Sequence, residues 1–145
     1  MTDSVTKIII VDNHPFVRQG MKKVIEQEAD LSVVFEAGSA HEALPMITGE
    51  EPDLAIIDIS MEQEENGFDL IKTIRSRFSK IKILALSMHD DNISAERAFG
   101  AGVNGYLSKT EAPSAIIKAI RTVMKGTPFL HGNISKRVLD MILKK

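Results

Sequence analysis

Four polar side chains lie at the ends of short apolar runs of the sequence, where buried strands would end. Asp12, Asp58, Ser87 and Lys109 hold these positions, and Asn13 follows Asp12. Because the carboxyl ends of parallel strands meet at one edge of a sheet, we expect the side chains to converge there. Taken singly, each has an ordinary interpretation as a helix cap, a turn hydroxyl or a solvated lysine. Their joint placement favours a functional site.

The chemistry that suits this set is the transfer of a phosphoryl group to a carboxylate, which depends mainly on positioning and charge neutralisation. Asp58 would be the nucleophile. Asp12, Asn13 and Asp58 offer the oxygen ligands that Mg²⁺ prefers. Lys109 would pair with one phosphoryl oxygen as a point charge, and the Ser87 hydroxyl would bond another.

The elements that must position these residues alternate between apolar strands and amphipathic helices. This alternation predicts an α/β fold, a doubly wound parallel sheet of five strands with helices on both faces. A capping box, Ser39 with Glu42, opens the second helix, and Pro45 inside that helix predicts a kink. Phe129 to Gly132 is expected to be a linker before a surplus last helix. The strands are expected at about 7–12, 31–36, 55–58, 80–86 and 104–107, and the helices at about 15–28, 40–47, 68–78, 92–99 and 113–124.

Length and composition narrow the class of protein. A chain of 145 residues is expected to form one domain, and the absence of cysteine excludes disulfides and thiolate metal sites. A net charge of −2 gives no general bias towards nucleic acid or membranes. No apolar run reaches the length of a membrane span, and the first residues lack the apolar core of a signal peptide. We therefore expect a cytoplasmic protein.

Five segments of the chain resemble a known family, the receiver domains of two-component response regulators. The resemblance is closest to the LuxR/NarL-type subfamily, which carries a DNA-binding helix-turn-helix domain after the receiver. It covers about residues 1–126. The segments are Ile-Ile-Val-Asp-Asn-His-Pro (9–15), Pro-Asp-Leu-Ala-Ile-Ile-Asp-Ile-Ser-Met (52–61), Asn-Gly (66–67), Leu-Ser-Met-His (86–89) and Gly-Ala-Gly-Val-Asn-Gly-Tyr-Leu-Ser-Lys (100–109).

The resemblance implies a flavodoxin-like fold with strand order 2-1-3-4-5. In this fold, ligands bind outside the carboxyl ends of the strands. It implies that Asp58 is the phosphoacceptor, that the Ser60 carbonyl joins the Mg²⁺ ligands, and that Ser87 and Tyr106 form a switch. It implies no organic cofactor and no enzyme, beyond self-catalysed phosphotransfer and dephosphorylation on Asp58.

The resemblance also implies partners. A sensor histidine kinase or a phosphotransfer protein would supply the phosphoryl group. A homodimer would form through the first and fifth helices. In the fifth helix, the apolar residues Ile117 and Met124 lie outside the narrow stripe that would face the core, so they are available for such a contact. DNA would be reached only through a C-terminal domain, and no membrane is involved.

Three departures from the family pattern limit these implications. Asn13 replaces the family's second acidic residue, so we expect weaker Mg²⁺ binding. Glu62 stands where a proline is usual, and Asn66-Gly67 comes one residue late. The acidic residues Glu62, Glu64 and Glu65 are expected to form a solvated loop. The sequence also stops before any helix-turn-helix pattern, so we expect a receiver domain at 1–126 and, at 127–145, a linker and extra helix leading to a further domain.

Other functions remain open at this point. Asn13 and Glu62 are compatible with a degenerate receiver that acts without phosphorylation as a dimerisation or interaction module. An aspartyl-nucleophile phosphatase would want an acidic residue at position 60, where this chain has Ser60. Flavin binding is disfavoured because the loop after Asp12 lacks a phosphate cradle rich in serine, threonine and glycine.

Overall fold

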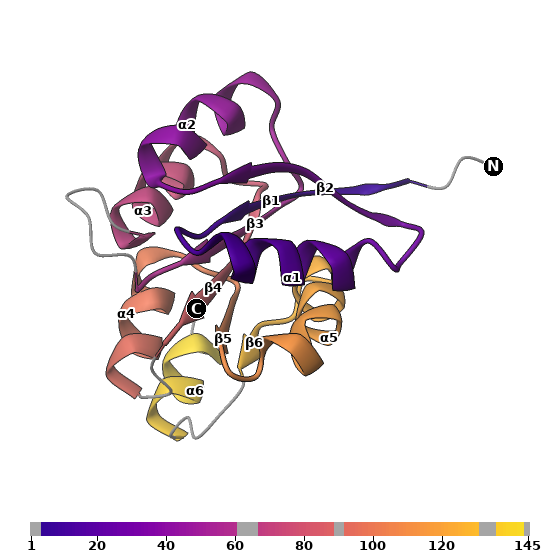
Figure 1. Ribbon diagram of the computed structural model, residues 1–145. Helices are drawn as coiled ribbons and strands as arrows, with labels where there is room; N and C mark the ends of the chain where they lie inside the picture. The colour runs from indigo at the N-terminus through magenta and orange to yellow at the C-terminus, as the bar shows by residue number, and fades with distance from the viewer. Residues whose placement is uncertain (1–3, 61–66, 89–91, 131–135, 144–145) are drawn as a thin grey trace.

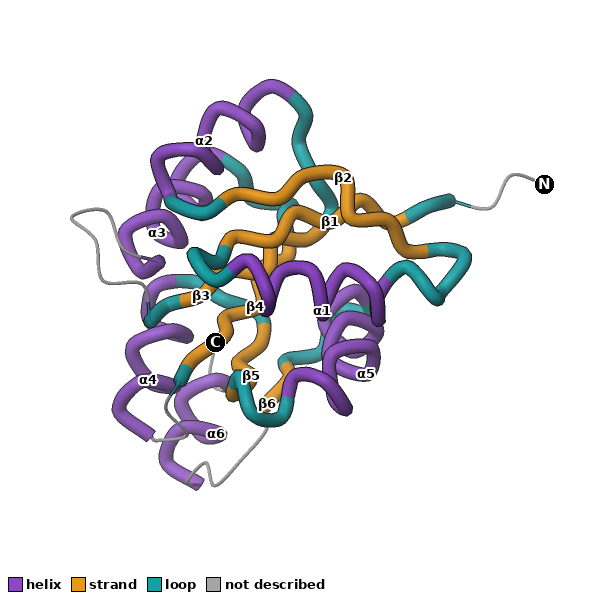
Figure 2. Tube along the Cα trace, viewed as in Figure 1, coloured by secondary structure: helices purple, strands orange, loops and turns teal. Residues whose placement is uncertain are grey.

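The computed structural model describes residues 4–60, 67–88, 92–130 and 136–143. Its centre is a parallel sheet with the order β2-β1-β3-β4-β5-β6, which confirms the doubly wound α/β fold and extends the predicted sheet by one strand. Figure 2 shows the strands lying between two groups of helices. The strands are β1 (Thr6–Val11), β2 (Leu31–Ala37), β3 (Leu54–Asp58), β4 (Lys82–Ser87), β5 (Gly105–Ser108) and β6 (Phe129–Leu130).

Helices cover both faces of the sheet. In Figure 1, α1 and α5 lie together on one face, and α2, α3 and α4 lie on the other. Among the described residues, none of the helices is long and apolar enough to cross a membrane. The helices are α1 (Pro15–Ile25), α2 (Ala40–Gly49), α3 (Gly67–Arg77), α4 (Asn92–Ala101), α5 (Ala112–Met124) and α6 (Lys136–Leu143).

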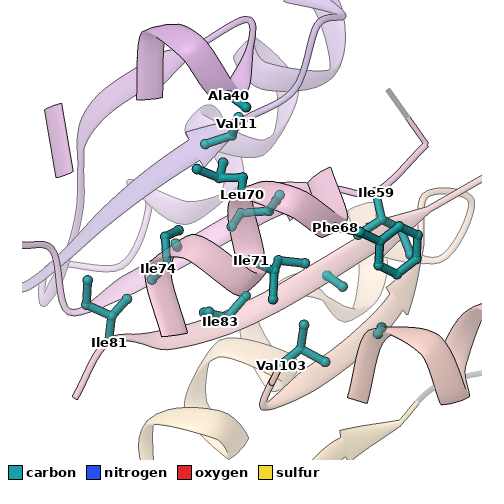
Figure 3. Packing of buried hydrophobic residues seen from close by; sticks show 14 of the residues in the cluster. Val11, Ala40, Ile59, Phe68, Leu70, Ile71, Ile74, Ile81, Ile83 and Val103 are labelled. Carbon is teal, nitrogen blue, oxygen red and sulfur yellow. The ribbon is translucent and has the colours of Figure 1, made fainter. Parts of the chain in front are cut away.

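The strands are apolar throughout because each face of the sheet has its own core. Successive side chains of a strand point to opposite faces. In β1, Ile8 and Ile10 pack with the α1–α5 layer, whereas Ile9 and Val11 pack with the α2–α3–α4 layer. Figure 3 shows the second core around α3, where Ile71 is fully buried.

The predicted start of α2 is confirmed. Ser39 Oγ accepts a hydrogen bond from the Glu42 backbone N–H at 3.1 Å. Glu42 Oε2 in turn accepts one from the Gly38 N–H at 3.1 Å. The helix continues through Pro45 to Gly49.

The segment that we expected to be a linker contains the sixth strand. Phe129 is buried and its N–H donates to the Asn104 carbonyl at 3.1 Å, while Phe129 and Leu130 pair in parallel with β5. Two apolar residues after a proline are too few to show a strand pattern, so the prediction of a linker was wrong here. In α6, Val138 is fully buried in the core of the α2–α3–α4 face. Asp91 and Asn133, which the sequence suggests as caps of the fourth and last helices, lie outside the described residues.

Candidate functional site

The register of the sheet brings the predicted site residues to one edge. Val11 pairs with Ile57 across β1 and β3, so that Asp12 and Asp58 follow at neighbouring positions. Ser87 pairs with Ser108 at the ends of β4 and β5. The backbone N–H of the next residue, Lys109, donates to the Ser87 carbonyl at 2.8 Å. The ends of β1, β3 and β5 therefore bring Asp12, Asp58 and Lys109 into contact, and the end of β4 lies beside β5.

One lysine is shared by two buried carboxylates. Lys109 Nζ lies 2.7 Å from Asp58 Oδ2 and 3.0 Å from Asp12 Oδ2. Both carboxylates are fully buried, and the Lys109 side chain is 7% exposed. With all three groups ionised, two negative charges face one positive charge. The pocket therefore keeps an excess negative charge that a cation would neutralise.

The second oxygen of Asp58 is fixed by the loop that follows β3. Asp58 Oδ1 accepts a hydrogen bond from the Ser60 N–H at 2.8 Å, and Ser60 Oγ accepts one from the Met88 N–H at 2.9 Å. Burial raises the pKa of Asp58, and neighbouring Asp12 adds to the rise, while the hydrogen bonds from Lys109 and Ser60 oppose it. The net result is a pKa above the ordinary value, because desolvation disfavours the charged form most strongly.

His14 lies at this site, although its position before Pro15 in the sequence suggests only a helix cap. Asp12 Oδ1 accepts a hydrogen bond from the His14 N–H at 2.8 Å and lies 3.0 Å from His14 Nδ1. The same ring nitrogen is 3.2 Å from Lys109 Nζ. His14 does occupy the N-cap position of α1, but its side chain makes no capping hydrogen bond. In the sequence, the signal for this contact is the position of His14 two residues after Asp12.

The remaining predicted residues take three different positions. Asn13 is exposed between β1 and α1. Ser87 is buried at the end of β4. Tyr106 is fully buried in the core of the α2–α3–α4 face. The acidic loop with Glu62, Glu64 and Glu65 lies outside the described residues, as does Asn66.

The donor set suits a divalent cation. Asp12, His14 and Asp58 each offer one ligand atom, and these atoms lie within 4.8 Å of one another. Carboxylate oxygens are the ligands that hard cations take, and the excess negative charge of the two aspartates favours a positive ion.

Comparisons with known proteins identify the class. Residues 8–121 match the family model of the response regulator receiver domain, so the chain belongs to that family. Its structural neighbours include a LuxR-family two-component response regulator and the receiver domain of a response regulator NarL. This confirms the family predicted from the five sequence segments.

Two curated relatives are a transcriptional regulatory protein DegU from Brevibacillus brevis and an oxygen regulatory protein NreC from Staphylococcus haemolyticus. The chain is 28% identical to the first over 133 residues and 33% identical to the second over 134 residues. Each match covers 92% of this chain, but 56% of the DegU relative and 62% of the NreC relative. The chain therefore spans somewhat more than half the length of these relatives.

Two solved structures show the same fold. A LuxR-family two-component response regulator from Aurantimonas sp. SI85-9A1 has a TM-score of 0.86 and 29% identity, with 97% of this chain and 99% of that chain covered. A structure of two RcsB dimers bound to two parallel DNAs has a TM-score of 0.82 and 27% identity, with 94% of this chain and 69% of that chain covered.

Proposed function

We propose that this receiver domain accepts a phosphoryl group on Asp58. The observation that carries the proposal is the buried Asp58 carboxylate, held by Lys109 at 2.7 Å and the Ser60 N–H at 2.8 Å beside a second buried aspartate. An Asp58 oxygen would form a bond to phosphorus while the bond between phosphorus and the donor's leaving group breaks. The leaving group would depart with the electron pair of that bond.

The surrounding residues have separate roles in this proposal. The Lys109 ammonium, which contacts the two carboxylates in the unphosphorylated protein, would pair with a phosphoryl oxygen. The Ser87 hydroxyl would donate a hydrogen bond to another phosphoryl oxygen. Tyr106 shares a core with Phe99 of α4, so a shift of Ser87 towards the phosphoryl group would be transmitted through Tyr106 to α4. The Ser87–Tyr106 pair is thus the proposed switch.

Asp12, Asn13, Asp58 and the Ser60 carbonyl are the proposed ligands of Mg²⁺. When bound, the ion would neutralise charge that develops on the transferring phosphoryl group. The two buried carboxylates with a single lysine fit this requirement, because they leave negative charge for the ion to balance.

A mass measurement tests the proposed function. The chain is incubated with acetyl phosphate, with Mg²⁺ or with an excess of chelator, and its intact mass is recorded. We expect the mass of one phosphoryl group to be added with Mg²⁺ and little to be added with chelator. An unchanged mass in both samples would instead favour the degenerate receiver, which acts without phosphorylation.

The relatives support a wider proposal about the whole protein. We infer that residues 1–126 form the receiver and that 127–145 lead to a C-terminal helix-turn-helix domain that controls transcription. The longer relatives, one of them named a transcriptional regulatory protein, support this arrangement. A sensor histidine kinase or a phosphotransfer protein would supply the phosphoryl group to this protein in the cytoplasm, and the chain would act on no external substrate.

The α1–α5 face is the proposed dimer interface, with a second copy of the chain as its occupant. Phe16 of α1 is 89% exposed at the end of an apolar groove of about 300 Å³. Exposed aromatic side chains beside apolar grooves are typical of interaction sites. The groove is lined by Phe16, Val17, Gly20, Met21, Val24, Lys109, Ala112, Pro113 and Ile116.

A charge on this face is expected to weaken the dimer. Met124 is half-buried near the end of α5 and packs beside the same core, so a carboxylate in Met124→Glu would have to be desolvated in the interface. We expect sedimentation velocity to show dimer for the wild type and a dissociation constant raised at least about tenfold for Met124→Glu. His41→Glu, at an exposed position of α2, is the control. A wild type that stays monomeric at every concentration would contradict this interface.

Restoring an acid at position 13 is expected to strengthen Mg²⁺ binding. An amide oxygen coordinates without a full negative charge, whereas Asn13→Asp adds one close to the ion. We expect a gain of about 1–2 kcal/mol, roughly tenfold in the dissociation constant, together with faster phosphorylation of Asp58. Gln19→Glu makes the same change of charge at an exposed position of α1. If the Mg²⁺ titration curves of wild type and Asn13→Asp coincide, the argument from ligand charge is wrong.

A further inference from the structure

The ring of His14 lies beside the charged groups of the pocket. Lys109 Nζ lies near one atom of each of three groups: Asp58 Oδ2 at 2.7 Å, Asp12 Oδ2 at 3.0 Å and His14 Nδ1 at 3.2 Å. The Lys109 ammonium therefore shows that all three groups can contact one positive charge. A divalent cation attracted by the excess negative charge would meet the same three groups.

The spacing of the His14 ring and Asp12 is that of two ligands on one ion. His14 Nδ1 lies 3.0 Å from Asp12 Oδ1. Neighbouring ligands of an octahedral ion with bonds of about 2.1 Å are separated by about 3 Å. All three donors of Asp12, His14 and Asp58 lie within 4.8 Å of one another, which places them within reach of a single ion.

The backbone holds His14 in this position. Pro15 follows it, and a residue before proline is restricted to extended conformations. His14 accordingly has φ −104° and ψ 105°, and its N–H is tied to Asp12 Oδ1 at 2.8 Å. These two constraints fix the direction in which the side chain leaves the loop, although the ring itself is 58% exposed.

We propose that His14 is a ligand of the divalent cation and gives this site a preference for ions that accept imidazole nitrogen. The inference rests on the cation site of the proposed function and specifies its ligands. Imidazole binds Ni²⁺ and Zn²⁺ well, whereas Mg²⁺ takes oxygen ligands and retains its waters. With Asn13 contributing no charge, a nitrogen ligand at position 14 shifts the site from a purely oxygen-based set to a mixed one.

Calorimetric titration of the whole chain with Ni²⁺ and with Mg²⁺ tests the preference. We expect the ratio of the Ni²⁺ to the Mg²⁺ association constant to fall about tenfold or more in His14→Ala, because loss of outer-shell partners alone has effects of that size in metal sites. His41→Ala removes an exposed histidine of α2 and should leave the ratio unchanged. An equal ratio in wild type and His14→Ala would overturn the proposal.

Pulsed electron paramagnetic resonance of bound Mn²⁺ tests the ligand directly. We expect a nitrogen-14 coupling in the wild type that disappears in His14→Ala and persists in His41→Ala. Retention of the coupling in His14→Ala with its loss in His89→Ala would assign the nitrogen to another histidine and overturn the proposal.

These results separate the ligand role from the phosphoacceptor role. If Asp58 is phosphorylated with Mg²⁺ while His14→Ala leaves the metal ratio and the nitrogen coupling unchanged, the ligand role is rejected and the proposed function stands. If both change in a protein whose Asp58 accepts no phosphoryl group, the ligand role stands and the proposed function is rejected.

Discussion

Replacing Lys109 with methionine is expected to lower the free energy of unfolding of the metal-free protein by about 3 kcal/mol at neutral pH. Methionine keeps much of the apolar stem but removes the ammonium, which lies within 3.0 Å of both Asp12 and Asp58. Two fully buried carboxylates would then face each other without a cation. Breaking a buried ion pair by removing one partner is costly for this reason. Denaturant unfolding in the presence of a chelator measures the loss.

The pH dependence of that loss follows from the pKa of Asp58. Burial already holds this pKa above the ordinary 3.8, so folding favours the protonated form. Protonated Asp58 stabilises the folded state. This contribution to the free energy of unfolding is fully present below the ordinary pKa of an aspartate, and it is lost as the pH rises through the raised pKa of Asp58 in the folded state. The deficit of Lys109→Met should therefore be largest at neutral pH and shrink on acidification.

A second variant separates the charge effect from packing. Asp58→Asn removes one of the two carboxylates, so the double variant Asp58→Asn/Lys109→Met should recover most of the stability that Lys109→Met loses. A deficit that persists in the double variant and is independent of pH would show that the lysine acts through packing instead.

Gly67→Ala is expected to destabilise the protein by about 3 kcal/mol, the upper end of what overpacking costs. A Cβ at this position would lie 2.3 Å from the Asp58 carbonyl oxygen and 2.8 Å from Ile59 Cα. Both neighbours are backbone atoms of the segment that carries Asp58, so they have little freedom to move aside. We therefore also expect phosphorylation of Asp58 to slow, because the clash displaces the end of β3.

Gly20→Ala is the matched control for this substitution. It lies inside α1, and no atom beyond the adjoining backbone of its own helix comes within 4 Å of an added Cβ. Since alanine is the better helix former, Gly20→Ala should stabilise the chain by up to about 1 kcal/mol. Equal effects of the two substitutions on the denaturant midpoint would contradict the close approach of α3 to Asp58.

The sequence specified most of the sheet because its strands have an unambiguous pattern. Runs such as Ile8 to Val11 are apolar on both faces, which is what a sheet covered by helices requires. The short strand Phe129–Leu130 was not predicted from the sequence, because two residues are too few to show a periodic pattern. Its burial depends on pairing with Gly105 and Tyr106, and that contact is tertiary.

The same distinction applies to the site. Asp12, Asp58 and Lys109 were predictable because each follows an apolar run, and parallel topology then places their side chains together. His14 was not predictable as a neighbour of Lys109, because it lies beyond the end of β1 and the loop conformation decides where its ring lies. The burial that raises the pKa of Asp58 is likewise a property of the assembled fold.

The most direct test of the account is the site of phosphorylation. Wild type, Asp58→Asn and Asp53→Asn are each treated with acetyl phosphate and Mg²⁺, and intact masses are compared. Asp53 is the matched control because it lies just before the same strand, β3, and accepts a hydrogen bond from the Lys7 N–H at 2.8 Å. We predict one added phosphoryl group in wild type and Asp53→Asn, and none in Asp58→Asn. Undiminished labelling of Asp58→Asn would contradict the account.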